Sequence, residues 1–338
     1  MKKCTPYLGQ PRVSLVSLFL SLISASSAWS AAVDQSAIPT VNRMPLIRLL
    51  GLPVAENADI VAKGHSKFQL SFEHSSLFNV DDAGPQQAFI DGESSSLTFS
   101  YRRAVSDRLV LGAELPVISH QSGFMDSFVE GWHRTFGFPN GRRDEFPRDQ
   151  LRYSITTPNG SIDLNSSATG IGDIALLAQY KLHDTNASRL TGQLRVELPS
   201  GDADELSGSG SVDVAIGALY ANSQLLSAVG AHFNAGGGVL FPGDSDLLPE
   251  LQKNTVFYAN ATLARRLFKD WLTVKLQLEA HTALYNTDIK PLGSTSVQFS
   301  FGAGIRLSKR WLMNVAMSED IAVRTAPDFT ILLGLEYR

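Results

Sequence analysis

The chain has 338 residues, of which 43% are hydrophobic and 18% are charged, and its formal net charge is -4. The mean hydropathy is only -0.01, and beyond the N-terminal region no apolar run approaches the roughly 20 residues that a spanning helix needs. A helical membrane protein is therefore disfavoured. Acidic and basic residues are intermixed, without the basic stripe that indicates a nucleic-acid partner. Any membrane-spanning segment must be a β-strand.

The N-terminus has the pattern of an export signal, in which basic residues precede an apolar stretch over 13–23. Small residues stand at Ala28 and Ser30, at the positions that signal peptidase reads. Cleavage after Ser30 fits this pattern best, and cleavage after Ala32 is the alternative. We therefore expect residues 1–30 to be a signal peptide.

From residue 67 onward apolar and polar residues alternate, as they do in strands with one apolar and one polar face. The clearest example is Val297, Phe299 and Phe301, which alternate with small or polar residues. Most such segments reach the 9 to 11 residues, roughly, that a tilted spanning strand needs. The pattern predicts twelve strands, near 67–74, 93–103, 108–118, 170–182, 188–199, 210–221, 226–241, 254–267, 271–285, 295–307, 311–321 and 327–338.

The links between these strands alternate between short and long, as they do in outer-membrane barrels with short periplasmic turns and longer outside loops. The expected short links are 104–107, 183–187, 222–225, 268–270 and 308–310, and the others are 75–92, 119–169, 200–209, 242–253, 286–294 and the brief 322–326. With an even number of strands, both termini would lie on the periplasmic side.

The predicted fold is therefore all-β, a transmembrane antiparallel up-and-down barrel of about twelve strands over residues 67–338. The alternative is a secreted β-sandwich or soluble barrel, which would need shorter strands. Residues 31–66 are expected to form a periplasmic N-terminal segment, acting either as a small plug or as a periplasmic contact. The last strand alternates from Phe329 to Tyr337 in the way that the barrel-assembly machinery recognises, although Arg338 follows the terminal aromatic residue.

Loop 119–169 is the longest predicted link, and such length without strand character often indicates function. Ser127 and Glu130 have the spacing of a capping box, apolar residues follow at helical spacing, and Gly137 can end a helix. We expect a short amphipathic helix on the barrel rim, in the lumen or at the membrane surface. The candidate functional residues of this loop are Asp126, Trp132, His133, Arg142, Arg143 and Asp144, the charged ones as ion pairs or contacts to lipopolysaccharide phosphates.

Several motifs resemble those of an uncharacterised bacterial domain-of-unknown-function family of predicted outer-membrane β-barrel proteins. They are Gly-Leu-Pro at 51–53, Phe-Ile-Asp-Gly-Glu at 89–93, Glu-Leu-Pro at 114–116, and the loop 119–169. The resemblance covers nearly the whole mature chain. It implies a barrel in the outer membrane, and it brings no substrate or catalytic residue with it.

Enzymatic and metal sites are the weaker interpretations. A lipid hydrolase would need His120 or His133 within hydrogen-bond reach of a hydroxyl such as that of Ser127. Acidic clusters at 202–205 and 244–250 lack the spacing of a defined calcium loop. The only cysteine precedes the apolar stretch of the signal. We therefore expect no catalytic residue, no metal and no cofactor.

The charged residues on the predicted lumen side have both signs, and we expect them to pair across the barrel, which excludes a wide general porin. The leading hypothesis is a narrow or gated channel for small or amphipathic solutes. The second is a structural or lipopolysaccharide-interacting barrel with a sealed lumen, and the third is the lipid hydrolase. The lumen-lining candidates are Arg102, Glu114, Arg195, Glu197, Lys275, Glu279, Arg306 and Glu336.

Overall fold

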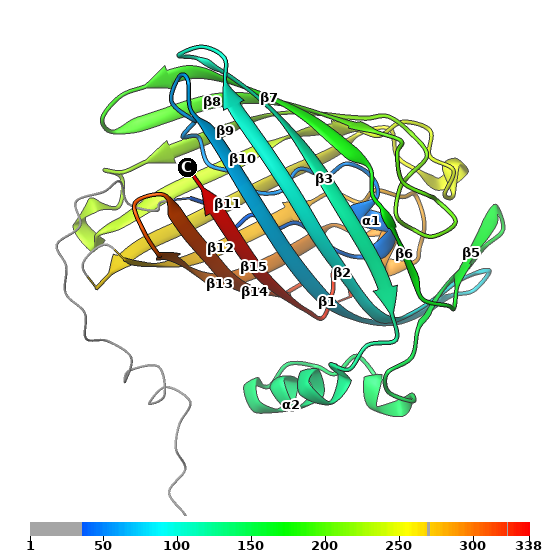
Figure 1. The fold of residues 1–338 in the computed structure, drawn as a ribbon. Helices are drawn as coiled ribbons and strands as arrows, with labels where there is room; N and C mark the ends of the chain where they lie inside the picture. Colours follow the sequence, from blue (N-terminus) through cyan, green and yellow to red (C-terminus); the bar gives the residue numbers. More distant parts are fainter. Residues whose placement is uncertain (1–35, 269–270, 323) are drawn as a thin grey trace, which may run out of the picture. The chain divides into compact units, whose positions relative to one another are not determined.

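The structure, a computed structural model, describes residues 36–268, 271–322 and 324–338. The predicted signal peptide lies outside the described residues. Within these ranges twelve long antiparallel strands form one closed barrel (Figure 1). They are β1 (Ser66–Ala83), β2 (Gln86–Ala104), β3 (Leu109–Gln121), β7 (Ile174–Asp184), β8 (Ser188–Leu198), β9 (Asp213–Asn222), β10 (Ala231–Phe241), β11 (Val256–Leu267), β12 (Leu272–His281), β13 (Ser296–Arg306), β14 (Trp311–Asp320) and β15 (Phe329–Tyr337).

Each barrel strand pairs with its neighbour in the chain, and β15 pairs with β1 to close the barrel. The closing register joins Phe68 to Tyr337 and Ser76 to Phe329. Closure leaves no unpaired strand edge, which is what a sheet in a lipid environment requires. Three shorter strands extend the wall beyond β2 and β3, namely β4 (Arg152–Thr157), β5 (Gly160–Leu164) and β6 (Ala168–Ile171).

The two ends of the barrel differ in their connections. At the short-turn end, close links join β2 to β3, β7 to β8 and β13 to β14, and the C-terminus lies there (Figure 1). At the long-loop end lie the longer connections, including residues 122–151 between β3 and β4. Apart from the link expected at 75–92, this is the pattern of links that the sequence predicts.

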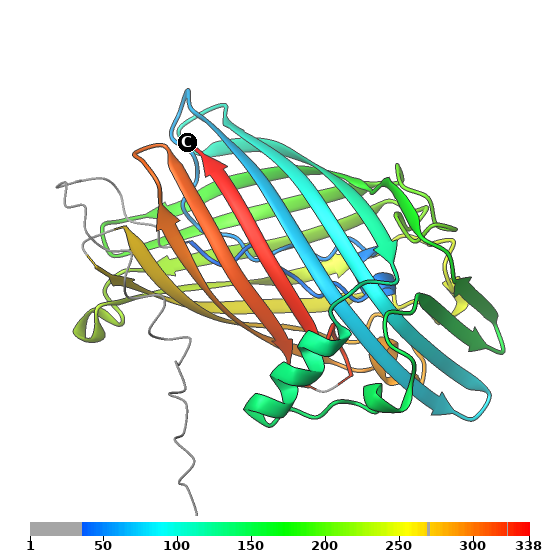
Figure 2. The ribbon, with the colours of Figure 1, turned by 60° about the horizontal axis from the view of Figure 1, so that its bottom comes forward.

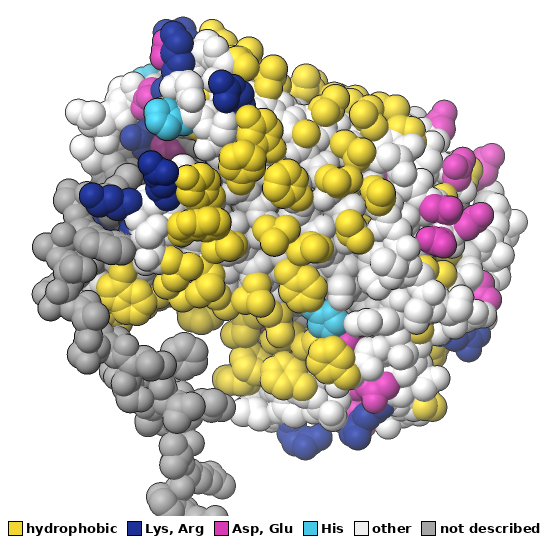
Figure 3. Space-filling view, in the orientation of Figure 1, with side chains coloured by type: hydrophobic (Ala, Val, Ile, Leu, Met, Phe, Trp, Pro, Cys, Tyr) yellow, Lys and Arg dark blue, Asp and Glu magenta, His cyan; other side chains and the backbone are white. Residues whose placement is uncertain are grey.

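Alternation of side chains divides the wall into an apolar outer face and a polar inner face. On β2, Leu97 and Phe99 are 43% and 45% exposed, whereas Ser96 and Ser100 are 2% and 6% exposed. The same alternation on neighbouring strands gives the barrel a wide apolar exterior (Figure 3). An apolar exterior around a polar interior is the arrangement of a membrane barrel.

The expected outside link at 75–92 is wrong, because β1 and β2 continue through it to a turn at Gly84 and Pro85. Over residues 75–79 both faces of β1 are covered. Leu77 is buried on the inside, and Phe78 packs outside against Phe146, with ring centroids 5.5 Å apart. Since neither face meets lipid or water, the apolar and polar residues no longer alternate along the sequence.

The helices are short: α1 (Pro45–Arg48), α2 (Asp126–Phe136) and α3 (Lys290–Gly293), with single 3₁₀ turns η1 (Arg143–Glu145), η2 (Ser227–Val229) and η3 (Pro249–Leu251). Among the described residues, none of them has the length and apolar character of a membrane-crossing helix. α2 occupies the part of loop 119–169 where the sequence predicts a helix, and it ends at Gly137, whose φ is 78°.

The predicted capping box at the start of α2 does not form. Met125 is the N-cap residue, and Ser127 lies inside the helix. The backbone N–H groups of Phe124 (2.8 Å) and Met125 both donate to Oε1 of Glu93 on β2. A barrel carboxylate therefore accepts the two backbone N–H groups that precede the helix, a contact that no local sequence pattern reveals.

α2 lies against the outer wall of the barrel at the long-loop end, beside β15 (Figure 2). Phe329 faces outward there and packs against Phe128 and Trp132, with ring centroids 5.4 Å and 5.6 Å apart. Met125 and Val129 complete this contact. The sequence left the rim, the lumen and the membrane surface open; the contacts place the helix outside the lumen, against the outer wall.

A large apolar cluster fills the inside of the barrel at the long-loop end. It joins α1 and its flanking residues to inward side chains of the strands and to the loops after β8, β10 and β12. Among its fully buried members are Leu46, Ile47, Leu50, Leu77, Ile90, Tyr153, Ile155, Leu240, Val256, Leu284, Tyr285, Ile289 and Leu292. The lumen is therefore filled by side chains at this end.

Candidate functional site

The N-terminal segment lies inside the barrel (Figure 1). Residues 36–58, which we call the luminal hairpin, run from the short-turn end to α1 and back. The N–H of Ala55 donates to the carbonyl of Thr40 (3.2 Å) and joins the two arms. The expectation that residues 31–66 form a segment on the periplasmic side is thus replaced, for residues 36–58, by a position in the lumen. The contacts agree with the plug, one of the two alternatives.

The first arm of the hairpin is bonded to the wall formed by β12 and β13. Ile38 makes two bonds of 2.8 Å to the amide of Gln277, one from its N–H and one to its carbonyl. The amide of Asn42 donates to the carbonyl of Thr325 (2.8 Å) and to the hydroxyl of Ser296 (3.2 Å). These bonds satisfy polar groups that would otherwise be buried without partners.

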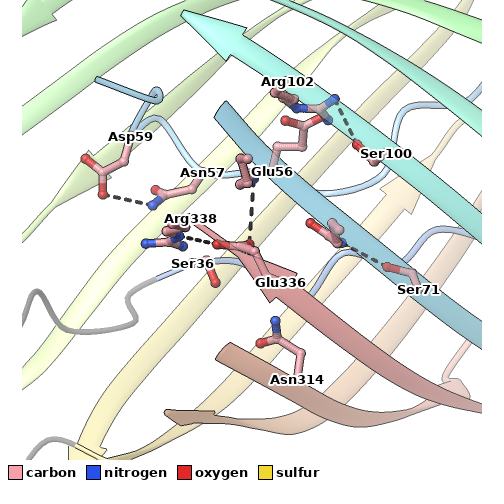
Figure 4. A network of polar contacts seen from close by, with 12 residues as sticks. Ser36, Glu56, Asn57, Asp59, Ser71, Ser100, Arg102, Asn314, Glu336 and Arg338 are labelled. Carbon is pink, nitrogen blue, oxygen red and sulfur yellow. Dashed lines mark hydrogen bonds and ion pairs between the residues drawn. The ribbon is translucent and has the colours of Figure 1, made fainter. Parts of the chain in front are cut away.

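The second arm is bonded to β2, β7 and β8. Oε1 of Glu56 lies 2.5 Å from Nη2 of Arg102, the pair seen together in Figure 4. The amide of Gln179 donates to Oε2 of Glu56 (2.7 Å), and the hydroxyl of Thr191 donates to the carbonyl of Ala58 (2.7 Å). The Glu56 carboxylate therefore links two walls of the barrel.

A second charge pair holds the hairpin to β1. Arg43 forms an ion pair with Glu73, which is 2% exposed, and the hydroxyl of Thr40 donates to the same carboxylate (2.7 Å). Near the tip, Nη1 of Arg48 donates to the hydroxyl of Ser94 (3.1 Å). Both arms thus carry a charged side chain paired with an opposite charge of the lumen.

Four of the predicted lumen residues form one network with the hairpin. Nη2 of Arg102 lies 3.1 Å from Oε1 of Glu114, Arg195 pairs with the same carboxylate, and Nη2 of Arg195 lies 3.4 Å from Oε2 of Glu197. These residues come from β2, β3 and β8, so the pairs follow the wall. The space across the lumen, where pairing was expected, is taken by the hairpin and its Glu56.

Two other predicted lumen residues lie on β12. Nζ of Lys275 bonds to Oδ1 of Asn314 (2.8 Å) and to the hydroxyl of Ser36 (2.9 Å). Oε1 of Glu279 accepts a hydrogen bond from the amide of Gln277. This side of the lumen also contacts the hairpin.

The last two lie at the short-turn end. Glu336 pairs with Arg338 and lies 3.7 Å from Nζ of Lys67, near the mouth of the lumen (Figure 4). Arg306 ends β13 on the inward side of its alternation. Charged side chains therefore surround the entrance that the hairpin passes.

Two cavities remain between the luminal hairpin and the wall of β1, β2 and β3. The larger, about 290 Å³, lies toward the short-turn end, and the smaller, about 70 Å³, lies deeper. Both have apolar and charged lining. The residues that border both cavities are Pro39, Val54, Gln69 and Glu114. Beyond the smaller cavity, the apolar cluster closes the long-loop end.

The candidate loop residues do not line the lumen. Arg143 is buried on the outer wall, where it pairs with Asp126 and with Asp328 (2.7 Å), and its guanidinium lies 5.3 Å from the ring centroid of Phe78. Oδ2 of Asp126 also accepts from the N–H of Asp149 (2.6 Å). These contacts hold the loop to β1 and to the start of β15.

The remaining loop candidates lie around α2. The ring of Trp132 packs against Phe136, with centroids 4.3 Å apart. Arg142 forms an exposed ion pair with Glu145 (2.7 Å), and Asp144 is exposed. The loop therefore has a buried charged anchor and an exposed face with both aromatic and charged residues.

His133 lies on the buried side of α2, with its Nε2 3.8 Å from Oε2 of Glu319. Burial and the charge of Arg143 lower the pKa of its imidazole. The carboxylates of Glu319 and Asp328 raise this pKa by more, so it lies above its ordinary 6.5. Burial also raises the pKa of Asp328. Because the pKa of His133 is raised, its protonated form stabilises the folded state. This stabilisation is complete below the unfolded-state pKa and is lost as the pH rises through the folded-state pKa.

We therefore expect the contact of α2 with the wall to weaken as the pH rises above about 6.5, by about 1.4 kcal/mol for each unit by which the pKa is raised. The measurement is the pH dependence of Trp132 fluorescence, obtained as the difference between the chain and its Trp132→Phe variant. His133→Gln should flatten the curve, and His65→Gln, at an exposed histidine, should leave it unchanged. A curve that stays steep in His133→Gln would contradict this assignment.

The structure does not bring the hydrolase candidates together. Nε2 of His120 bonds to the carbonyl of Leu206 (3.0 Å), His133 faces Glu319, and Ser127 is exposed on α2. In the acidic loop at 202–205, a carboxylate oxygen of Asp202 accepts backbone N–H bonds from the following turn. Within the described ranges, no group of three or more acidic, histidine or cysteine side chains is placed to hold a metal ion.

The hairpin residues Arg43, Glu56 and Asn42 are functional candidates that the sequence analysis did not name. Their partners lie between 30 and 283 positions away in the chain. The available signal was compositional: charged residues in a segment that is otherwise rich in leucine and proline, ahead of the first strand.

Three comparisons with known proteins bear on the fold. A family model described as a protein of unknown function (DUF3187) matches residues 14–338. The COG4313 outer membrane channel from Pseudomonas putida F1 is similar with a TM-score of 0.54 and 14% identity, over 83% of this chain and 97% of that one. No curated protein matches the chain.

Other solved structures are similar at lower TM-scores. They include the KdgM porin in complex with disordered oligogalacturonate (0.41, 10% identity, 80% of this chain and 98% of that one) and the toluene transporter TodX of P. putida (0.43, 11%, 82% and 91%). The closed barrel, its apolar exterior and the likeness to the COG4313 channel agree in fold. The chain is an outer-membrane β-barrel in a lipid environment.

Proposed function

We propose that this chain, which belongs to the DUF3187 family, is a gated channel for small or amphipathic solutes, closed by the luminal hairpin. One observation carries the proposal: charges of the lumen are paired with charges of the hairpin, as in Glu73 with Arg43 and Arg102 with Glu56. When the hairpin moves away, the charged side chains that it pairs with stay on the wall, and the lumen becomes polar and open to water.

The solute class follows from the larger cavity. Its lining combines apolar residues such as Val54 and Ile60 with charged residues such as Glu56 and Arg102. Its volume of about 290 Å³ is at the low end of the roughly 300–1,000 Å³ that small-molecule sites occupy. A small molecule with one apolar and one polar part fits this lining.

The second candidate function, a structural barrel with a sealed lumen, is favoured by a different observation. Leu46, Ile47 and Leu50 at the hairpin tip are buried in the apolar cluster at the long-loop end. Burial of each side chain contributes about 1.5–3 kcal/mol. If the hairpin never leaves, these contacts make the barrel a scaffold for its outer loop.

Single-channel recording in planar bilayers separates the two candidates. Arg43→Ala with Glu56→Ala removes the hairpin member of each ion pair and leaves Glu73 and Arg102 buried without those partners, at a cost on the order of 3–5 kcal/mol for each broken pair. Because every 1.4 kcal/mol is about tenfold, we expect the open probability to rise at least about tenfold, with discrete openings in the same membrane.

The matched control is Arg142→Ala with Glu145→Ala, which removes an ion pair exposed on the outer loop. Deletion of residues 123–149 is a second control, because that loop lies on the outer wall. Both should leave the conductance unchanged. Silence of the hairpin variant, with the barrel still folded by heat-modifiable migration on a gel, would reject the channel and leave the sealed scaffold.

We also propose two partners at the membrane. Arg134 is exposed on α2, and Arg148, which pairs with Glu130, is exposed in the segment after it; guanidinium groups of this kind can bind lipopolysaccharide phosphates. The alternating residues of β15 from Phe329 to Tyr337 form the strand that the barrel-assembly machinery would recognise. Both proposals rest on residue type and position in the barrel.

A further inference from the structure

A serine, a histidine and a glutamate meet on the outer face of β1 and β2. His74 is directly opposite Ser95 in the strand register, and Glu93 precedes Ser95 by two residues on the same face of β2. The next residues on this face toward the short-turn end are Phe72 on β1 and Leu97 on β2, which are 38% and 43% exposed. The three side chains therefore lie where the apolar outer wall meets the long-loop end.

The three side chains form one chain of hydrogen bonds. The hydroxyl of Ser95 lies 2.8 Å from Nδ1 of His74, and Nε2 of His74 lies 2.8 Å from Oε2 of Glu93. An ionised carboxylate only accepts hydrogen bonds, so the proton of the neutral imidazole is on Nε2. Nδ1 is then the acceptor, and the Ser95 hydroxyl donates to it.

The rest of the site holds this arrangement in place. Oε1 of Glu93 accepts the backbone N–H groups of Phe124 and Met125, so the loop before α2 fixes the carboxylate. The ring of Phe124 stacks on the imidazole, with centroids 5.4 Å apart and planes at 13°. Glu93 and His74 are 1% and 6% exposed, whereas Ser95 is only half-buried. The hydroxyl is the accessible end of the chain.

From this geometry we infer that Ser95, His74 and Glu93 form a hydrolase site that takes the acyl ester of a membrane lipid. Nucleophile, base and orienting carboxylate are within hydrogen-bond reach in the order that ester hydrolysis requires. The exposed apolar side chains of Phe72 and Leu97 continue the surface that contacts acyl chains. A lipid lying on the wall brings its ester group to the level of Ser95.

The reaction has two steps that share the same groups. Oγ of Ser95 bonds to the ester carbonyl carbon while its proton passes to Nδ1 of His74, and the acyl C–O bond then breaks as the proton leaves with the alcohol. Water adds to the acyl-serine with Nδ1 again taking the proton, and the fatty acid leaves as Ser95 recovers its hydrogen. Glu93 is a positioning residue that fixes the tautomer and stabilises the imidazolium.

The test uses the full chain in mixed micelles of detergent and phosphatidylethanolamine, with a fluorophosphonate probe and with fatty-acid release as the two readouts. We expect the probe to label Ser95, as located by mass spectrometry. Ser95→Ala should abolish labelling, and His74→Asn should lower the rate by about a hundredfold or more. Glu93→Gln should lower the rate and shift its pH profile, which loss of a purely structural contact would not do.

Ser94→Ala is the matched control, because Ser94 is the adjacent serine on β2 and faces the lumen, 2% exposed. It should be labelled and active like the unmodified chain. Heat-modifiable migration checks that every variant is folded. Folded chain with no label on Ser95 and no fatty-acid release would overturn the inference and leave the three residues as an anchor for α2. The outcome is independent of conductance.

Discussion

Deletion of residues 36–58 is expected to turn a mostly closed barrel into one that conducts steadily. The deletion removes both charged contacts of the hairpin and the α1 tip, which fills the apolar cluster at the long-loop end. Between this end and the short turns, what remains inside the wall is a lining of serine, threonine and paired charges such as Arg102 with Glu114. Such a lining admits water. The measurement is single-channel current against voltage.

A substitution at the tip checks the deletion without shortening the chain. Leu50→Asp puts a carboxylate among buried apolar side chains, where an unpaired charge costs several kcal/mol, roughly. We expect it to lower the closed fraction in the same direction as the deletion. Val105→Asp, at an exposed position in the short turn between β2 and β3, is its control. If both the deletion and Leu50→Asp give folded barrels that stay silent, the loops alone close the barrel and the hairpin is not the gate.

The second large effect is expected from Arg143→Met, which keeps most of the side-chain volume and removes the charge. Arg143 is 2% exposed and pairs with both Asp126 and Asp328. Removing the charge of Arg143 leaves the carboxylates of Asp126 and Asp328 without their cation. Breaking a buried ion pair in this way costs about 3–5 kcal/mol, and the lower figure applies because Asp328 is partly exposed. The segment 122–151 should therefore detach from the outer wall while the barrel stays folded.

Limited proteolysis measures this detachment, because a detached loop is cut much faster than a docked one. The change should be specific to the buried guanidinium, so Arg142→Met, at the exposed neighbour, should be cut at the rate of the unmodified chain. Adding Asp126→Asn to Arg143→Met should restore part of the protection by removing one unpaired charge. Equal cutting rates in all variants would mean that the aromatic contacts of Phe329 alone hold the loop.

The barrel could be predicted from the sequence wherever one face of a strand meets lipid and the other meets polar groups. Val297, Phe299 and Phe301 on β13 are an example, since solvent on one face and lipid on the other impose the alternation. The same principle explains the error at 75–92. There both faces of β1 are covered, Leu77 by the inner cluster and Phe78 by the outer loop.

The candidate site was less accessible to sequence reasoning, because its contacts are distant in the chain. Asn42 bonds to Thr325, and Ile38 to Gln277, 283 and 239 positions away. Alternation identified which charged residues face inward, but it carries no information about a third element lying between opposite walls. Similarly, the alternation from Phe329 to Tyr337 predicts a strand, but nothing local indicates that α2 covers Phe329.

The tether of the hairpin gives its motion a direction. Residues 59–65 connect it to β1 at the short-turn end, where Asp59 lies 2.7 Å from Arg189 and the carbonyl of His65 accepts the N–H of Ala104. Because this tether is at the short-turn end, the tip would withdraw toward that end, and its leucines would pass along the polar inner wall. Under the proposed function, a force on the hairpin directed toward the short-turn end therefore acts along its path of withdrawal, whereas a force from the long-loop end presses the tip into the apolar cluster. The proposed gate would open in one direction only.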